Sequence, residues 1–375
     1  MTFSILSENL QKKLSFVIHA VSQRSQLPVL LNLLLETKNG KLYISATDLE
    51  IGIQVEIPAN IEEEGATTVP AKTFYEAINS LPTGKIIFQT EKNELKISSL
   101  KIKSTFQTIP KDEFPKLYEE KGEKLTTIKK EALQKDFARV VFAAALDLGR
   151  PALSGVLIKK DTDGGFLLVA TDGYRLSLKH QAQIVTKKTK KDKEESEKPL
   201  LIPARVLREA TLIKEEGDVD VFISEKSNQI LLEQNGTILV GRLIDAEFPN
   251  YEKIIPTDFA TRFFFDKEEL QKAVKMCAIF ARDSANIVRL SVKKDAVTVS
   301  ANTPSVGENT VEVEAKIEGE ENEIAFNARY LLDLFGNLEE EEMVFEMIGP
   351  LSPGVFKIKG DSSFLHLIMP IRVQQ

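Results

Sequence analysis

Apolar residues recur at helical spacing in three widely separated stretches of the chain, and each stretch predicts an amphipathic helix. We expect the first helix to begin with Ser7 as its capping residue. The apolar positions are Leu10, Leu14, Val17, Ile18 and Val21 in the first stretch, Leu133, Phe137, Val140, Val141 and Ala144 in the second, and Leu270, Val274, Cys277, Ala278 and Ala281 in the third. All three stretches carry Leu-Gln-Lys in the same phase, which predicts an internal threefold repeat.

A second helical signature also occurs three times, at 71–77, 204–210 and 328–334. Each copy starts with alanine and a basic residue, and an acidic residue follows four positions after the basic one. This spacing predicts an ion pair along each helix. Alternating apolar segments between the helices predict strands, and Asn39-Gly40 predicts a hairpin turn in the first repeat.

The repeat predicts an α+β fold of three similar domains, each with the order helix, strands, helix, strands. We expect the domains at 1–121, 122–256 and 257–375. The middle repeat is the longest because it contains the charged run 187–198, which we interpret as a solvated surface loop.

Length and composition agree with a multidomain globular protein, because 375 residues exceed a typical single core. Apolar residues make up 42% and charged residues 28% of the chain. No apolar run is long enough to span a bilayer, and the start lacks the pattern of a signal peptide. We therefore expect a cytoplasmic protein with no membrane partner. The net charge of −7 does not exclude nucleic acid, since binding depends on where the charges lie.

The chain lacks the residue sets of common active sites. There is no phosphate-binding loop, no dinucleotide fingerprint and no serine nucleophile elbow. Cys277, the single cysteine, falls on a core face and predicts a buried structural thiol. Asp48 and Asp172 occupy equivalent Ala-Thr-Asp segments, and we expect each to fix a turn through backbone amides. The histidines have no metal-ligand spacing, and we expect each at a surface or boundary: His19, His180 and His366.

Six basic residues occupy repeated helix positions: Lys12, Lys72, Lys135, Arg205, Lys272 and Arg329. Each taken alone is an ordinary solvated position. Pseudo-symmetric domains would place all six on equivalent surfaces, which favours contact with phosphates without reading of bases.

The chain resembles the bacterial sliding clamp family, the β subunit of DNA polymerase III, over essentially its whole length. The resemblance rests on the order and spacing of these motifs: Leu-Pro-Val-Leu at 27–30, Ala-Thr-Asp-Leu-Glu at 46–50, Gly-Ala-Thr-Thr-Val-Pro-Ala at 65–71, Ala-Thr-Asp-Gly-Tyr-Arg-Leu at 170–176, Phe-Pro-Asn-Tyr at 248–251 and Met-Pro-Ile-Arg at 369–372.

The resemblance implies a head-to-tail homodimeric ring with helices lining a central hole and antiparallel sheets outside. Such a ring encircles duplex DNA without sequence preference and tethers the replicative polymerase, which raises processivity without catalysis. An ATP-driven clamp loader opens the ring, and repair proteins also dock on it. The resemblance implies no metal or other cofactor in the clamp itself.

The resemblance also implies a peptide-binding pocket between the second and third domains. Its residues would be Leu153, Thr171, Gly173, Tyr174, Arg175, Leu176, Pro249, Lys253, Ile254, Asn327, Tyr330, Leu351, Leu367, Ile368, Met369, Pro370, Ile371 and Arg372. The chain departs from the family pattern at Lys253, where we expect arginine, at Tyr174, where some relatives have histidine, and at Ala285, where an aromatic residue can occur. Gln374 and Gln375 extend past the usual terminus.

The resemblance adds Arg24 to the DNA-contacting residues, and the corresponding places in the other repeats add Arg150 and Arg282. For the joint between protomers we expect Phe106 against Ile279 and Phe280. Two alternatives stay open: a scaffold that binds peptides without encircling DNA, and an enzyme whose site is dispersed across domains. The lack of any nucleophile, metal or phosphate motif counts against the enzyme.

Overall fold

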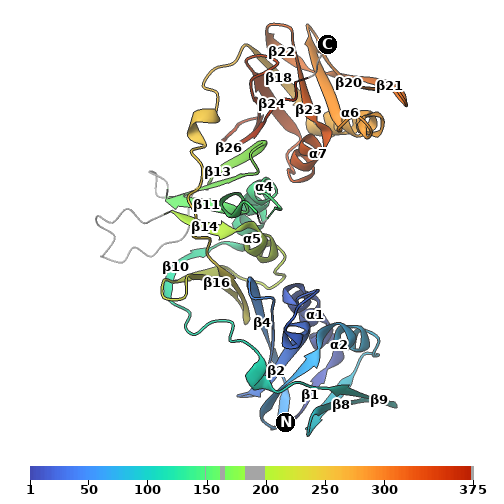
Figure 1. Cartoon of the computed structure of the whole chain (residues 1–375), viewed down its shortest axis with the longest axis vertical. Helices are drawn as coiled ribbons and strands as arrows, with labels where there is room; N and C mark the ends of the chain where they lie inside the picture. Colours follow the sequence, from blue (N-terminus) through green and yellow to red (C-terminus); the bar gives the residue numbers. More distant parts are fainter. Residues whose placement is uncertain (148, 161–164, 182–198, 373–375) are drawn as a thin grey trace. The chain divides into compact units, whose positions relative to one another are not determined.

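The computed structural model describes residues 1–147, 149–160, 165–181 and 199–372 (Figure 1). Two predicted features, the charged run 187–198 and the terminal Gln374-Gln375, lie outside these residues. The described chain divides into two compact units, which are treated separately below. The first contains 1–134 and 205–243, and the second contains the described residues of 135–204 and 244–372.

The first unit contains two antiparallel sheets (Figure 1). The larger has the order β10 (Glu123–Ile128), β15 (Val219–Ser224), β16 (Gln229–Gln234), β17 (Thr237–Arg242), β4 (Ile51–Pro58), β3 (Lys41–Thr47), β2 (Asn32–Lys38) and β6 (Gly65–Pro70). The smaller has the order β5 (Asn60–Glu63), β1 (Thr2–Leu6), β7 (Lys85–Glu91), β8 (Glu94–Ser99) and β9 (Ile102–Gln107). The helices are α1 (Ser7–Val17), α2 (Ala71–Asn79) and α5 (Ala204–Thr211), with 3₁₀ turns at Ile18–Ala20, Pro28–Leu31 and Lys111–Glu113.

The second unit has the same plan. Its larger sheet has the order β14 (Leu200–Pro203), β11 (Gly155–Lys160), β12 (Phe166–Thr171), β13 (Arg175–Gln181), β26 (Asp361–Ile368), β25 (Gly354–Ile358), β24 (Glu342–Met347), β18 (Thr261–Asp266) and β22 (Lys316–Gly319). Its smaller sheet has the order β21 (Gly307–Glu314), β20 (Ala296–Thr303), β19 (Ile287–Lys293) and β23 (Asn322–Asn327). The helices are α4 (Ala138–Val141), α6 (Lys267–Ala281) and α7 (Ala328–Gly336), with 3₁₀ turns at Pro151–Leu153 and Glu252–Ile254.

The two larger sheets run without a break across the predicted domain boundaries. In the first unit β4 pairs with β17, so strands expected in the first and second domains share one sheet. In the second unit β13 pairs with β26 in the same way. The family's expectation of continuous antiparallel sheets therefore holds within each unit.

The helical repeat is confirmed, with local differences. The first and third helices form as α1 and α6, whereas the second is interrupted: α3 (Lys130–Ala132) leads into a π-helical turn at Leu133–Phe137 and then α4. Ser7 does not cap α1, because Leu6 is the capping residue. The buried Ser7 hydroxyl instead donates to the Pro82 carbonyl at 3.1 Å and accepts from the Gly84 amide at 3.0 Å.

The repeated glutamine of Leu-Gln-Lys has a structural role in two of the repeats. Gln11 Nε2 donates to the Ile78 carbonyl at 2.9 Å, and Gln134 Nε2 donates to the Thr211 carbonyl at 3.5 Å. In both cases the acceptor lies at the end of the second helix of the repeat. The glutamine thereby ties the two helices of a repeat together.

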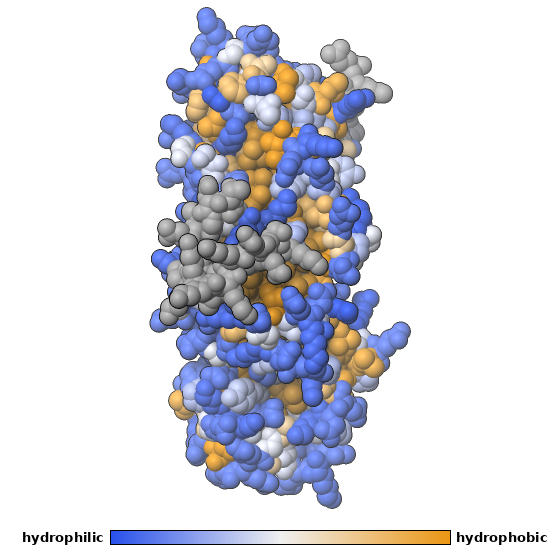
Figure 2. Space-filling view, turned by 90° about the vertical axis from the view of Figure 1, so that its left-hand side faces the viewer, coloured by the Kyte–Doolittle hydropathy of each residue, from blue (hydrophilic) through white to orange (hydrophobic). Residues whose placement is uncertain are grey.

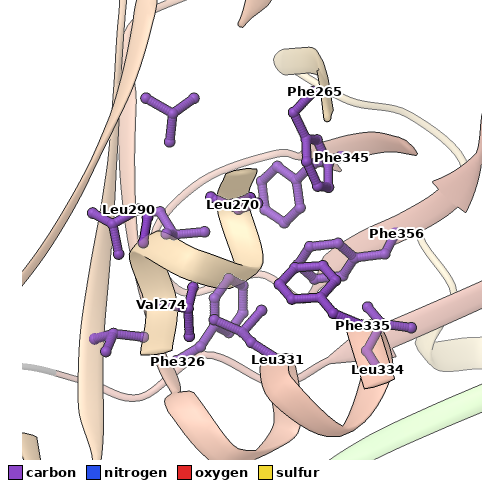
Figure 3. Close-up of a cluster of buried hydrophobic side chains, with 14 of the residues drawn as sticks. Phe265, Leu270, Val274, Leu290, Phe326, Leu331, Leu334, Phe335, Phe345 and Phe356 are labelled. Carbon is purple, nitrogen blue, oxygen red and sulfur yellow. The ribbon is translucent and has the colours of Figure 1, made fainter. Parts of the chain in front are cut away.

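The core of the second unit lies between its two sheets and around α6 and α7 (Figure 3). Leu270 and Val274 of α6 point toward Leu331 and Phe335 of α7, and Phe356 of β25 joins them (Figure 3). All five are at most 1% exposed. Cys277 belongs to the same cluster, which confirms the predicted buried thiol, and burial raises its pKa to about 11. Such a thiol carries little thiolate at neutral pH, so it is a core residue rather than a nucleophile.

The hairpin prediction is confirmed, because Asn39 and Gly40 both have positive φ angles, 51° and 73°, between β2 and β3. The prediction for His366 is wrong. It was expected at a surface or boundary, but its side chain on β26 is completely buried, and its ring stacks on Phe142 with centroids 5.2 Å apart.

Candidate functional site

The second Ala-Thr-Asp segment forms a tight turn between β12 and β13. The Asp172 carboxylate oxygen Oδ1 accepts from the amides of Tyr174 and Arg175 at 2.9 and 3.0 Å. Thr171 Oγ1 donates to the Arg175 carbonyl at 2.6 Å and accepts from the Gly173 amide at 3.0 Å. This confirms that Asp172 fixes a turn. Gly173 has φ +92°, a conformation that glycine adopts without strain.

The first Ala-Thr-Asp segment forms the same turn between β3 and β4. Asp48 Oδ1 accepts from the amides of Glu50 and Ile51 at 3.1 and 3.0 Å. Thr47 Oγ1 donates to the Ile51 carbonyl at 2.7 Å and accepts from the Leu49 amide at 3.0 Å. The prediction for Asp48 is confirmed, and the two turns share one hydrogen-bond scheme.

Arg175 holds the second turn against the third repeat. Its Nε donates to Asp172 Oδ2 at 3.0 Å, and its Nη1 donates to Asp333 Oδ2 of α7 at 2.7 Å. The guanidinium also lies over the rings of Tyr330 and Phe142, 4.7 and 5.5 Å from their centroids. Arg175 is only 9% exposed, so its guanidinium is enclosed by its partners rather than available at the surface.

The predicted pocket residues fall into a buried and an exposed group. Leu176, Leu367 and Ile368 are fully buried where β13 pairs with β26, so their side chains are not accessible at the surface. Thr171 is also buried at 5% exposure. The exposed apolar members are Tyr174 at 58%, Leu351 at 60%, Ile254 at 41% and Met369 at 37%.

A backbone hydrogen bond connects two of the exposed members directly. The Met369 amide donates to the Tyr174 carbonyl at 2.8 Å, and the Ile371 amide donates to the Ala325 carbonyl at 2.8 Å. The Tyr174 and Tyr330 rings are stacked with centroids 6.4 Å apart, and burial raises the pKa of Tyr330. We call residues 171–176, Tyr330 and 367–372 the turn-171 site.

None of the contacts described above joins the remaining predicted pocket residues to this site. Leu153 is partly buried, Asn327 caps α7 by accepting from the Arg329 amide at 3.0 Å, and Pro249 and Lys253 are exposed. Within the turn-171 site, Pro370 is partly buried and Arg372 is exposed. Ala285, one of the departures from the family pattern, has a φ of +54° after α6. The membership of all these residues in a pocket stays a prediction.

Three residues that contact the turn-171 site from outside were not predicted to do so. Arg150, predicted to contact DNA, donates from Nη1 to the Asp172 carbonyl at 3.1 Å. Phe142 and Asp333 contact Arg175 as described above. The repeated acid of the second helical signature, of which Asp333 is one copy, was the only sequence signal for these contacts.

The predicted ion pairs along the second helices are wrong in two repeats, because the acids bind elsewhere. Asp333 binds Arg175 rather than Arg329. Glu209 of α5 binds His19 at 2.8 Å, while Arg205 binds Asp48 at 2.5 Å. The helices are therefore fastened to neighbouring elements instead of being stabilised along their own length.

The predicted DNA-contacting residues differ in exposure and in whether an acidic side chain lies beside them. Exposed positions hold Lys12, Arg24, Lys72, Arg282 and Arg329. Lys272 is exposed but pairs with Glu268 at 2.8 Å, and Lys135 is exposed but lies 3.4 Å from Glu340. Arg205 is half-buried by its ion pairs with Asp48 and Glu50. The carboxylates paired with Lys272, Lys135 and Arg205 already partly neutralise these side chains, which weakens their attraction for phosphate.

The predicted protomer joint contains one exposed and two packed residues. Ile279 is 50% exposed on α6. Phe280 is partly buried against the core of the second unit, and its carbonyl accepts from Thr303 Oγ1 at 2.5 Å. Phe106 lies on β9, the edge strand of the smaller sheet of the first unit, but its ring is only 8% exposed and packs edge-on against Phe74.

The surface drawn in Figure 2 is mostly hydrophilic, with separate hydrophobic patches. No helix among the described residues is long and apolar enough to cross a membrane. In the same part of the chain, no group of three or more histidine, cysteine or acidic side chains is arranged to hold a metal ion.

Three family models match successive parts of the chain. They describe the N-terminal, central and C-terminal domains of the DNA polymerase III beta subunit and match residues 1–118, 127–250 and 252–372. The beta sliding clamp of Staphylococcus aureus is 27% identical over 385 residues, covering 99% of both chains.

Solved structures agree with the family models over the whole chain. The beta subunit of DNA polymerase III from Thermotoga maritima has a TM-score of 0.89 and 28% identity, and a sliding clamp from Bartonella birtlesii bound to griselimycin has a TM-score of 0.91 and 26% identity. Both comparisons cover 100% of each chain. The fold of three clamp domains is thereby confirmed, and sliding clamps are processivity factors rather than catalytic subunits. The chain belongs to the family of the DNA polymerase III beta subunit, the bacterial β sliding clamps.

Proposed function

We propose that this protein is a sliding clamp that encircles duplex DNA as a head-to-tail homodimer and tethers the replicative polymerase. The observation that carries the proposal is the match of all three clamp domains, in order, over nearly the whole chain. The proposed domains remain 1–121, 122–256 and 257–375. The protein would act where a bacterial chromosome lies, in the cytoplasm.

The open sheet edges support a ring built from two chains. In the smaller sheets, β9 ends the sheet of the first unit and β21 ends that of the second. Unpaired edge strands present backbone donors and acceptors to a further strand. One β9 edge and one β21 edge per chain suit a head-to-tail dimer, in which each joint uses one of each. Ile279, Phe280 and Phe106 are the side chains we propose for this joint.

Binding to DNA would be electrostatic and independent of sequence. The candidates that are exposed and form no ion pair within the described part of the chain are Lys12, Arg24, Lys72, Arg282 and Arg329. Lysine and arginine that contact phosphates give salt-dependent affinity without base readout. Such contacts allow sliding, while a closed ring prevents dissociation.

We propose the turn-171 site as the docking site for peptide segments of the polymerase, the clamp loader and repair proteins. Its floor would be the fully buried Leu176, Leu367 and Ile368. Its exposed Tyr174 and Met369 offer an aromatic and an adaptable apolar contact. Griselimycin bound to the Bartonella birtlesii clamp is a ligand of a related protein and supports the idea that clamps of this family accept such ligands.

Retention on circular DNA tests the ring. The protein is loaded with a clamp loader and ATP onto nicked circular DNA, and the complex is passed through a gel-filtration column at high salt before and after one cut of the circle. We expect co-migration with the circle and release from the linear form. Loss from both forms at high salt would favour a peptide-binding scaffold that does not encircle DNA.

A further inference from the structure

A cavity lies in the first unit beside the first Ala-Thr-Asp turn. It has a volume of about 190 Å³ and is lined by Thr47 and residues 49–52 of the turn, the segment 115–117, Ser227, and residues of β16 and β17. We call it the turn-47 pocket. The turn that frames it has the same hydrogen bonds as the turn of the turn-171 site.

The two sites correspond in backbone but differ in side chains. At the turn-171 site, the Met369 amide donates to the Tyr174 carbonyl at 2.8 Å. At the turn-47 pocket, the Arg242 amide donates to the Glu50 carbonyl at 3.4 Å. Arg242 therefore takes the place of Met369, and Glu50 takes the place of Tyr174. An apolar pair in one site is replaced by charged residues in the other, so the two sites suit ligands of different chemistry.

Two basic side chains line the turn-47 pocket, and neither has a charged partner among the described residues. Lys116 and Arg242 line it, and both are exposed. Neither side chain makes an ion pair or a side-chain hydrogen bond with any part of the chain that the structure describes. The Glu50 carboxylate also lines the pocket but forms no ion pair with either cation, and it lies 3.4 Å from Arg205. Two uncommitted cations in one pocket favour a ligand with a carboxylate or another anionic group.

Leu49, an apolar residue that also lines the pocket, adopts a strained backbone conformation. Leu49 has a φ of +77°, a left-handed conformation that costs a residue with a Cβ about 1–2 kcal/mol. Its side chain is nevertheless 58% exposed, so the conformation gives Leu49 no burial of its own. Strained residues of this kind occur where a ligand is held. The corresponding residue of the turn-171 site is Gly173, which adopts the same region freely.

We propose that the turn-47 pocket is a second docking site for partner proteins and takes a peptide segment with an acidic side chain next to an apolar one. The carboxylate would bind between Lys116 and Arg242, and the apolar side chain would pack on Leu49 and Leu117. The comparison with the turn-171 site rests on the proposed function, whereas the free cations and the strained leucine stand independently of it.

The test measures fluorescence anisotropy of a dye-labelled hexapeptide of alternating glutamate and leucine, titrated with the full-length protein. We expect saturable binding that Arg242→Met weakens at least tenfold, because this substitution removes one cation and keeps a long side chain. Leu49→Gly removes the apolar contact and relieves the strain, so we expect weaker binding by a well-folded protein. A hexapeptide of alternating lysine and leucine should not bind.

The matched control is Lys38→Met, since Lys38 is an exposed lysine of the first unit that does not line the pocket. Equal loss of binding in Lys38→Met and Arg242→Met would mean that the peptide is held only by the overall charge of the protein, and it would overturn the proposal. Displacement of the hexapeptide by duplex DNA or inorganic phosphate, beyond the effect of sodium chloride at equal ionic strength, would assign the pocket to phosphates and overturn it as well. Loss of binding in Met369→Ala would place the hexapeptide at the turn-171 site. That result would overturn this proposal without contradicting the proposed function.

Discussion

Arg175 of β13 and Asp333 of α7 form an ion pair of 2.7 Å that joins the turn of the second repeat to the second helix of the third. The same guanidinium binds Asp172 and lies over Tyr330, so one buried side chain fixes the turn, the helix and an aromatic residue of the proposed docking site. Because the arginine is 9% exposed, its removal would leave its partners poorly satisfied.

Arg175→Ala should lower the free energy of unfolding by about 3 kcal/mol, the scale of breaking a buried ion pair. Asp333→Ala should cost less, because the Asp333 side chain is 49% exposed and solvent screens its charge. Differential scanning calorimetry of both variants measures the order. A larger loss in Asp333→Ala than in Arg175→Ala would contradict the role assigned to Arg175.

Met369→Ala should weaken binding of a peptide from the C-terminus of the replicative polymerase about tenfold, because it removes an exposed apolar contact. Its effect on stability should be small, since Met369 lies beyond the end of β26 and is 37% exposed. Leu176→Ala is a different kind of change. Leu176 is fully buried, so we expect a loss of about 2–5 kcal/mol in stability from the cavity left behind.

Calorimetry of the peptide titration and thermal unfolding of each variant separate these two effects. Unchanged peptide affinity in Met369→Ala would remove the docking assignment from the turn-171 site. The position of the ring joint is tested separately below, so that result would not bear on the ring.

Ile279→Glu should shift the protein from dimer to monomer, because a charge replaces an apolar residue proposed to lie in the joint between protomers. Met276→Glu is the matched control, since both residues lie on α6 and both are 50% exposed. Sedimentation velocity over a range of concentrations measures the dimer fraction. Equal dissociation in both variants, or in neither, would move the joint away from Ile279.

His366 should make the protein less stable in mild acid. Burial lowers the pKa of His366 well below its ordinary value of 6.5, and the nearby Arg175 charge lowers it further. The unfolded chain then takes up a proton that the folded chain refuses, so stability is fully present above about pH 6.5 and falls as the pH drops below it.

His366→Gln should flatten the fall in stability between pH 7 and pH 5, measured by urea unfolding at several pH values. His180→Gln, at an exposed position, should keep the slope of the wild-type protein. A wild-type slope in His366→Gln would mean that other groups cause the acid sensitivity. The Ser177 hydroxyl, 2.6 Å from His366 Nδ1, offers the glutamine a hydrogen-bond partner.

The sequence predicts the repeated helices well because their apolar periodicity is long and in phase at Leu10, Leu133 and Leu270, all of which are buried. It predicts the two aspartate turns because their bonds are local to a few residues. The π-helical turn at Leu133–Phe137 has no periodic signal, since it changes the helix register without changing which residues are apolar.

The errors of interpretation concern contacts between distant segments. His366 follows the alternation of a strand, but its burial depends on Phe142 and Ser177, which are far away in the chain. The acids of the second helical signature look like local pairs, yet Asp333 and Glu209 bind Arg175 and His19 instead. Arg150 could not be placed at the turn-171 site from spacing alone, because its partner is a backbone carbonyl of another loop.

The pairing of β13 with β26 has a consequence for how the chain can be divided. A fragment cut at the predicted boundary after residue 256 would strip β26 from β13 and leave Leu176 and Leu178 beside an open edge. Such an edge favours aggregation. A fragment that starts near residue 135 preserves this nine-stranded sheet, but it removes β4 from β17 and β10 from β15 and so opens two edges in the first unit. The repeated segment of the sequence is therefore not an independently complete sheet, because strand pairing crosses both predicted boundaries.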